Sequence, residues 1–474
     1  MSRESKLAKN TVILSIGTFL PKLASFITLP ILTGYLTKVE YGTYDLVSVL
    51  VSLLLPAATL EIQVAAFRFL IDVRNDEDAV KTIVTNIVLF ILPTSLVALI
   101  VLYFFLPGQA TIVRLFICLY FLADITVNCA RQICRGLSRT LDYSLSAIIS
   151  ALGKVIFVVI CIRYLKAGLL GTVISLFGAS SASLLYLVFR VKLYKYFDIS
   201  KFDKNKLYEM LKYSWPMVPN SMSAWVMRVS DRLVVTAVMG PAANAVYSVA
   251  NKLPSLLNLA QTTFTMAWQE NAAIVSKDAD ASEYYSSMFR VILNLLTGFF
   301  CLLIALTPFL FRILIRGNYN EAINQMPILF VAMYFLGLST YLGGIFIAYK
   351  RSNSIGITTV VAATINLLVD LGTIRFIGLY AASGSTLISY LFLFVFRLFT
   401  VQRIVKVKYN PGYLMFSLVL IFASTILFYF QNTHLNIINL IYGLIVFYCL
   451  NESFVKAVIR KVTQLARRHM LSKQ

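Results

Sequence analysis

The chain has 474 residues, of which 59% are hydrophobic and only 13% are charged, and its mean hydropathy is +0.79. Soluble domains are typically about 45 to 50% apolar and 25% charged, so this composition excludes a soluble globular protein and indicates an integral membrane protein. The formal net charge of +21 does not indicate nucleic-acid binding, because most of the basic residues lie in the short connections between apolar segments.

Apolar segments long enough to cross a hydrocarbon core of about 30 Å recur along the whole sequence. We therefore predict an all-α polytopic membrane protein with 14 transmembrane helices. The predicted helices are residues 11–33, 43–70, 82–106, 111–131, 144–164, 169–190, 213–239, 245–271, 288–311, 326–349, 354–376, 379–400, 413–431 and 435–455. The basic start runs into the first segment without a cleavage-site pattern, which indicates a retained helix rather than a signal peptide.

The connections carry many more Lys and Arg residues on one side of this arrangement than on the other. Because cytoplasmic loops are enriched in these residues, we expect both termini on the cytoplasmic side of the membrane. The basic segment 190–212 contains Leu207, Met210 and Leu211 at helical spacing, which predicts a short amphipathic helix on the anionic inner leaflet.

Two parts of the chain resemble each other. Residues 36–50 align with residues 239–253 at an offset of 203, and residues 168–175 resemble residues 378–389. This similarity predicts a parallel repeat with the substrate path between its halves. The predicted domains are an N-terminal six-helix bundle (1–200), a C-terminal six-helix bundle that starts with the basic linker (201–408), and an extra helix pair with a basic cytoplasmic tail (409–474).

Basic residues inside the apolar segments are the strongest pointer to function. A cation near the bilayer centre costs about 2.5 to 3.5 kcal/mol, so it normally faces a polar cavity. Six such residues stand out, namely Lys22, Arg68, Lys154, Arg228, Arg232 and Lys252.

The seventh segment carries the densest signals. Arg228 and Arg232 share a helix face, and Asp231 lies beside them, so the three leave a net positive site suited to a diphosphate or an acidic sugar. The alternative is a structural ion-pair cluster. Pro216 and Pro219 predict a bend near the start of this helix, as Pro21 and Pro30 do in the first segment, and a moving gate is one interpretation of both bends.

The other four cations divide into two pairs. Lys22 and Lys154 have no carboxylate at helical spacing, so we expect them to line the cavity and contact substrate. Arg68 and Lys252 lie near predicted helix ends, where they can extend to the surface, so they are weaker candidates for the substrate path.

Five acidic residues inside the segments are candidates for ion coupling, namely Glu61, Asp124, Asp231, Glu270 and Asp370. Glu61 and Arg68 are seven residues apart, as are Asp124 and Arg131, and each pair can be structural. Asp370 has no basic residue within one turn. An intramembrane carboxylate of this kind can bind and release H⁺ or Na⁺, although a structural polar contact is the alternative.

Cysteine and histidine usage argues against metal, cofactor and enzyme chemistry. The six cysteines lie in or beside apolar segments and lack metal-ligand spacing with a histidine, so we expect small core residues and no cofactor. The two histidines, His434 and His469, fall in a predicted loop and in the tail. The chain is therefore predicted not to be an enzyme.

Several loose patterns occur together in a characteristic order. They are Leu36 to Tyr44 (LTKVEYGTY), Lys212 to Pro219 (KYSWPMVP), the later Ser230, Asp231 and Arg232, and Gly168 and Gly378 at the starts of the sixth and twelfth segments. Over its whole length the chain resembles the Wzx-type polysaccharide repeat-unit flippases, whose superfamily includes multidrug and toxic-compound extrusion transporters and the lipid II flippase. The resemblance implies a protein of a bacterial or archaeal cytoplasmic membrane, with two six-helix bundles that alternate between inward-open and outward-open states.

The resemblance also implies a substrate, which is an undecaprenyl-diphosphate-linked oligosaccharide for O-antigen, capsule or exopolysaccharide, with variable ion coupling. Implied partners are membrane lipids, H⁺ or Na⁺, and a polysaccharide polymerase and glycosyltransferases. A drug or metabolite antiporter of the same fold is the main alternative. A membrane polysaccharide polymerase is a distant one, because the predicted outer loops are short and almost lack histidine.

Overall fold

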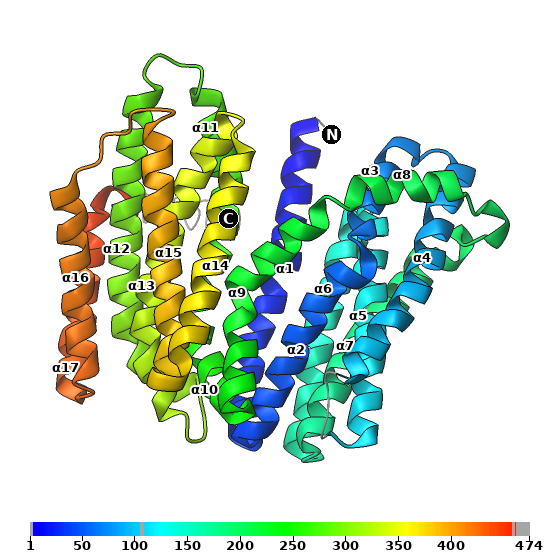
Figure 1. The fold of residues 1–474 in the computed structure, drawn as a ribbon, viewed down its shortest axis with the longest axis horizontal. Helices are drawn as coiled ribbons and strands as arrows, with labels where there is room; N and C mark the ends of the chain where they lie inside the picture. Colours follow the sequence, from blue (N-terminus) through cyan, green and yellow to red (C-terminus); the bar gives the residue numbers. More distant parts are fainter. Residues whose placement is uncertain (1–2, 105–108, 457–459, 461–474) are drawn as a thin grey trace, which may run out of the picture. The chain divides into compact units, whose positions relative to one another are not determined.

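The computed structural model describes residues 3–104, 109–456 and 460, and these residues form long helices joined by short turns (Figure 1). No strand occurs among them, so the predicted all-α class is confirmed. Some side chains within the helices lie outside the described part of the chain, and these are residues 3–16, 18, 220, 224, 227, 228, 257–263, 266, 267 and 352. Arg228 belongs to this group, and the tail that carries His469 also lies outside the described residues.

The chain divides into two compact units, and the first consists of Met1–Ser248 with Leu314–Asn318. Its regular elements are α1 (Arg3–Tyr35), α2 (Lys38–Thr59), α3 (Ile62–Val73), α4 (Glu77–Phe104), α5 (Thr111–Gly136), α6 (Thr140–Val158), the π-helix η1 (Val159–Tyr164), α7 (Gly168–Val191), the 3-10 helices η2 (Leu193–Tyr196) and η3 (Ile199–Lys201), α8 (Lys204–Ser214), α9 (Met217–Met239) and the start of α10 (Pro241–Lys252). Within this unit α1 packs on α6, α7 packs on α5 and α6, and α2 packs on α9.

The second unit consists of Val249–Ile313 and Tyr319–Gln474. It contains the end of α10, the 3-10 helix η4 (Pro254–Leu256), α11 (Leu257–Val275), α12 (Ala281–Leu314), α13 (Asn320–Ala348), α14 (Ser352–Ile377), α15 (Leu379–Gln402), α16 (Pro411–Tyr429) and α17 (Thr433–Leu450). Helix α13 lies at the centre of this unit, where it packs on α11 and α15. In its most apolar stretch, 78% of the residues are buried. Because neighbours surround α13, it is apolar on all sides rather than along one stripe.

Eleven of the described helices are long and apolar enough to cross a membrane. Their outer faces carry large apolar side chains, such as Phe376 and Phe104, which are 86% and 75% exposed. Large exposed apolar surfaces of this kind are expected to face lipid rather than water. The chain is therefore a multi-pass membrane protein.

Two segments that the sequence predicts as single helices are broken. Residues 43–70 form α2 and α3, which are separated by Leu60 and Glu61 with φ of 46° and 56°. Residues 245–271 form α10 and α11 with η4 between them. The prediction failed at the first break because left-handed backbone normally requires glycine, and neither residue is a glycine.

The linker before α9 also differs in detail from its prediction. A helix does form there, and α8 packs against α3 and α4 with Met210 fully buried. However, Pro216 caps the start of α9 and Pro219 lies in its first turn. These prolines therefore separate two helices instead of bending one, since proline is well tolerated in the first turn of a helix.

Candidate functional site

A seam of polar contacts joins α2 and α9 within the first unit. The Nη1 atom of Arg232 lies 3.1 Å from the Oδ1 atom of Asp45. Two turns away on both helices, the indole N–H of Trp225 donates to the hydroxyl of Ser52 at 2.9 Å. Because the contacts pair 45 with 232 and 52 with 225, α2 and α9 run antiparallel, and residues seven apart on each helix face the partner helix.

Asp45 is the centre of this seam. Its side chain is only 4% exposed, whereas that of Arg232 is 18% exposed. Asp45 also accepts hydrogen bonds from the hydroxyl of Ser248 at 2.7 Å and from the amide of Asn244 at 3.4 Å, both on α10. A buried carboxylate is tolerable in such a place because a cation and several donors satisfy its oxygens.

Asp231 faces a different partner from its neighbour Arg232. Its Oδ2 atom accepts a hydrogen bond of 2.7 Å from the hydroxyl of Tyr247, and Asp231 is 7% exposed. The sequence predicts one carboxylate beside the arginines of this helix, but Asp45 supplies a second. The ion pair formed by Arg232 is therefore made with α2 and not with Asp231.

A second cation of the first unit lies beside the same stretch of α2. The ammonium group of Lys154, on α6, lies 5.7 Å from the ring centre of Tyr44, a cation–π distance. The rings of Tyr44 and Tyr41 are 6.0 Å apart. Lys22 is half-buried on α1, which packs on α6. Among the described residues, neither lysine forms an ion pair with a carboxylate.

The remaining basic candidates are placed less centrally. Arg68, on α3, forms an ion pair of 2.7 Å with Asp72, and both side chains are at least half exposed. Lys252 is half-buried in the last turn of α10. Arg228 lies one helical turn before Arg232 in α9, but its side chain lies outside the described part of the chain.

Neither of the two candidate pairs that share a helix face, Glu61 with Arg68 and Asp124 with Arg131, forms a direct ion pair among the described residues. Glu61 lies at the break between α2 and α3 and accepts from the amide of Gln63, while Arg68 contacts Asp72 instead. Asp124 accepts a hydrogen bond of 3.1 Å from Asn128. Arg131 donates to the hydroxyls of Ser146 and Ser183 at 3.1 and 3.0 Å. Glu61, Arg68 and Asp124 thus find nearer partners on their own helices, whereas Arg131 finds its partners on α6 and α7.

The second unit holds the last two acidic candidates. Asp370 is fully buried on α14, one turn after Asn366, whose amide donates to the hydroxyl of Ser385 on α15 at 3.3 Å. An amide of α14 and a hydroxyl of α15 therefore meet one turn before Asp370. Glu270, by contrast, is exposed on α11.

Two charged residues were missed by sequence reasoning. Asp45 was overlooked because it lies near the start of its segment, although its alignment with Ser248 in the repeat was a usable signal. Arg397 is 6% exposed on α15 and donates to the carbonyl oxygen of Ser339 and to the hydroxyls of Thr358 and Thr359. It lies inside a predicted span, so it should have been counted with the six cations.

The described helices adopt the fold of a class of multi-helix membrane proteins whose solved members are transporters and flippases. A structure described as the lipid II flippase MurJ in an inward-closed conformation aligns with 94% of this chain and 100% of that chain, with a TM-score of 0.69 and 14% identity. An inward-facing multidrug resistance MATE family transporter of the MOP superfamily aligns with 83% and 98%, with a TM-score of 0.65 and 16% identity. A MOP superfamily transporter from Pyrococcus furiosus aligns with 84% and 95%, with a TM-score of 0.56 and 12% identity.

The family follows from the sequence itself. Residues 7–269, more than half of the chain, match the model of the polysaccharide biosynthesis protein family, so the chain belongs to that family. The predicted relationship to this group and its superfamily fold is thus confirmed. Comparison with curated protein sequences gives no match.

Proposed function

We propose that the chain moves undecaprenyl-diphosphate-linked oligosaccharide repeat units from the inner to the outer face of the cytoplasmic membrane by alternating access. A diphosphate joined to several sugars cannot cross hydrocarbon unaided, because burying its charges is too costly. Its lipid tail can stay in the bilayer while the headgroup passes through a cationic groove. Membership of the polysaccharide biosynthesis family and the fold shared with a lipid II flippase support this proposal.

The environment of Lys154 is the observation that best supports the proposal. Its ammonium group lies over the ring of Tyr44, and it forms no ion pair with a carboxylate among the described residues. An intramembrane cation with this environment has charge left for an anionic ligand. Lys22 on the packed neighbour α1 can add a second positive charge. Arg228 and Arg232 on α9 are further candidates for substrate contact, and the ion pair with Asp45 offsets the charge of Arg232.

Substrate flipping in proteoliposomes tests the role of Lys154. We expect Lys154→Ala to lower the rate of headgroup translocation at least about tenfold, since a hydrogen bond to a charged group contributes about 1.5 to 3 kcal/mol, and Lys154→Arg to retain part of the rate. The matched control is Lys166→Ala, which removes an exposed lysine beyond the same helix. Equal rates for the wild-type chain and Lys154→Ala would overturn the assignment.

A drug or metabolite antiporter is the second candidate, and the structural likeness to a MATE transporter favours it. The two functions predict different phenotypes for Arg228→Ala. A flippase loses polymer export while drug resistance stays unchanged, whereas an antiporter loses resistance. A polymerase would be indicated instead if cells lacking the protein accumulated outward-facing, unpolymerised repeat units.

Ion coupling is the part of the proposal that rests on Asp370. This carboxyl group is fully buried on α14, and Asn366 and Ser385 provide neutral oxygen and amide groups nearby. Carboxylates inside membrane proteins commonly carry H⁺ or Na⁺ through a transport cycle. We place the coupling step at Asp370, with Asp231, Asp124, Glu61 and Glu270 as weaker candidates.

The proposed topology has both termini in the cytoplasm and the repeat halves at 1–200 and 201–408. Single cysteines in a cysteine-free chain test it with a membrane-impermeant maleimide on whole cells. We expect Lys166→Cys, between η1 and α7, to react from outside and Ser200→Cys, in the α7–α8 linker, to be protected. Reaction at Ser200→Cys alone would reverse the topology.

A further inference from the structure

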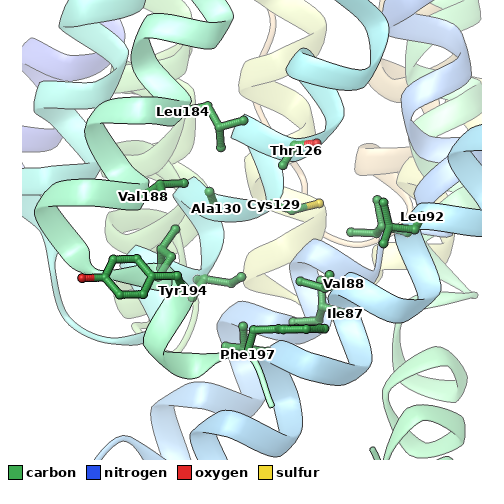
Figure 2. Close-up of a pocket in the computed structure, with 14 residues that line it drawn as sticks. Ile87, Val88, Leu92, Thr126, Cys129, Ala130, Leu184, Val188, Tyr194 and Phe197 are labelled. Carbon is green, nitrogen blue, oxygen red and sulfur yellow. The ribbon is translucent and has the colours of Figure 1, made fainter. Parts of the chain in front are cut away.

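An apolar pocket of about 270 Å³ lies in the first unit between α4, α5, α7 and η2 (Figure 2). Its lining includes Leu92 of α4, Thr126 and Cys129 of α5, and Val188 of α7. The Thr126 hydroxyl donates to the carbonyl of Leu122 in its own helix, so its hydrogen is not available to a ligand. Figure 2 shows the hydroxyl end of Tyr194 turned away from the other labelled side chains. The pocket therefore suits a hydrocarbon.

The dimensions of the pocket fit part of one lipid chain. Its lining on α4 runs from Val84 to Leu92, a rise of about 12 Å along a helix. Half of a hydrocarbon core is about 15 Å thick, so the pocket extends through most of one leaflet. An apolar cavity of about 150 Å³ is sufficient for a benzene molecule. The volume here has room for a segment of acyl chain and none for a sugar-bearing headgroup.

Positive charge lies at one end of this pocket. Lys192 and Lys195 are exposed, and they flank the lining residues Leu193 and Tyr194 in the segment that follows α7. Lys192 ends α7 in the left-handed conformation, with φ of 59°, and so begins the turn that carries η2. In the described structure neither lysine forms an ion pair with a carboxylate.

The carboxylates of the surrounding elements are engaged elsewhere. Asp142 lies 3.8 Å from Arg139 and 3.9 Å from Arg190. Asp78 forms an ion pair of 3.1 Å with Lys201. Asp198 accepts hydrogen bonds from the hydroxyl and the backbone N–H of Ser200, and these bonds lower its pKa, the hydroxyl having the larger effect. The two lysines at the pocket thus keep a positive charge for an external anion.

We propose that this pocket binds an anionic phospholipid, with one acyl chain between α4, α5 and α7 and its phosphate on Lys192 and Lys195. The combination of an apolar slot one leaflet deep with two lysines at its end matches a lipid of this class. The bound lipid fills the space beneath η2 and so holds the α7–α8 linker against the helices. This site is separate from the proposed substrate path and does not depend on the proposed function.

Native mass spectrometry of the delipidated full chain tests the proposal. Phosphatidylglycerol and phosphatidylcholine with identical acyl chains are the probes. We expect phosphatidylglycerol to bind about tenfold more tightly and Lys192→Gln/Lys195→Gln to abolish this preference, because each interfacial lysine attracts anionic lipid. The matched control is Lys204→Gln/Lys212→Gln, which removes two exposed lysines of α8 in the same linker, and we expect it to keep the preference.

A second variant tests the slot independently of charge. Thr126→Trp places an indole in the pocket at an exposed position of α5, so it should fill the slot without disturbing the core. We expect it to weaken phosphatidylglycerol binding and to abolish photocrosslinking of a diazirine-labelled acyl chain to residues 84–92 and 184–197. Equal binding of the two phospholipids, crosslinks outside these segments, or stronger binding of polyprenyl phosphate at the same residues would each overturn the proposal.

Discussion

The hydroxyl of Ser248 donates a hydrogen bond of 2.7 Å to the carboxylate of Asp45, and the two residues are 203 positions apart. The same offset relates Tyr44 to Tyr247 in the repeat predicted from sequence. Equivalent residues of a two-fold repeat can touch only beside the rotation axis, as in a symmetric dimer. The amide of Asn244 also donates to the carbonyl of Gly42 at 3.0 Å. The start of α2 and the start of α10 therefore meet where a parallel repeat would place its axis.

The first prediction concerns the ion pair of Asp45 and Arg232. Asp45→Asn should destabilise the protein by about 3 kcal/mol, because it leaves the largely buried guanidinium without its carboxylate partner. Arg232→Gln should also destabilise. Thermal unfolding of the purified variants should show that the double variant loses less than the sum of the two, since both single changes break the same contact.

The exposed pair of Arg68 and Asp72 provides the control. Asp72→Asn removes a carboxylate from an ion pair of shorter distance, 2.7 Å, but both side chains are at least half exposed. Exposed pairs contribute little, so we expect a much smaller change in melting temperature. Additive losses at Asp45 and Arg232 would show that the two side chains do not stabilise each other. A loss at Asp72 equal to that at Asp45 would show that burial does not strengthen the inner pair.

The sequence predicted the helices well and their interruptions poorly. Apolar runs of about 20 residues leave little choice but a membrane-spanning helix, so all 14 predicted segments contain helix. The break at Leu60 and Glu61 gave no signal because neither residue is a glycine or a proline. The start of α2 did carry a signal that was missed, since Thr37, six residues before the predicted start at residue 43, forms a capping box with Glu40.

Partners were harder to predict than helices. Helical spacing correctly places Arg232 and Asp231 on one helix, but it does not reveal their partners. Arg232 forms an ion pair with Asp45, and Asp231 accepts a hydrogen bond from Tyr247. The spacing of seven residues favoured a pair of Asp124 with Arg131, whereas Arg131 reaches across to Ser183 on α7. Contacts between helices depend on packing that a single sequence does not encode locally.

The second prediction concerns the close approach of α2 to α10. A Cβ atom at Gly42 would overlap the carbonyl oxygen of Pro241, which is backbone and cannot rotate away. Gly42→Ala should therefore push α10 from α2 and lower both the melting temperature and the yield of folded protein. The matched control is Gly372→Ala in α14, where an added Cβ meets nothing within 4 Å. We expect this control to be neutral or stabilising because alanine favours helix.

The third prediction concerns Trp268, which is 2% exposed in the second unit. Its ring stacks on Tyr341 with centroids 4.6 Å apart, and its indole N–H donates to the carbonyl oxygen of Tyr341 at 2.8 Å. Trp268→Ala should cost about 3 to 5 kcal/mol. Trp268→Phe keeps a stacked ring but removes the donor, so it should cost about 1 to 3 kcal/mol.

Thermal unfolding again provides the measurement for Trp268, and Trp215→Ala is the control. Trp215 is 57% exposed, so its removal creates no cavity, and we expect a small change. If Trp268→Phe were as destabilising as Trp268→Ala, the hydrogen bond rather than packing would dominate the contribution of this side chain.

The fourth prediction concerns coupling at Asp370. Asp370→Asn has nearly the same shape as the native residue but cannot ionise, so the fold should persist while the response to an ion gradient is lost. Substrate translocation by proteoliposomes with imposed Na⁺ or H⁺ gradients measures this response. Translocation by the wild-type chain should accelerate with the gradient of its coupling ion. Translocation by the variant should stay at the rate seen without any gradient.

The control is Asp278→Asn, at an exposed carboxylate between α11 and α12, and it should respond to the gradient like the wild-type chain. If Asp370→Asn still accelerates with the gradient, then the coupling group is another carboxylate, and Asp231 is the next one to test because it is also buried in a membrane helix.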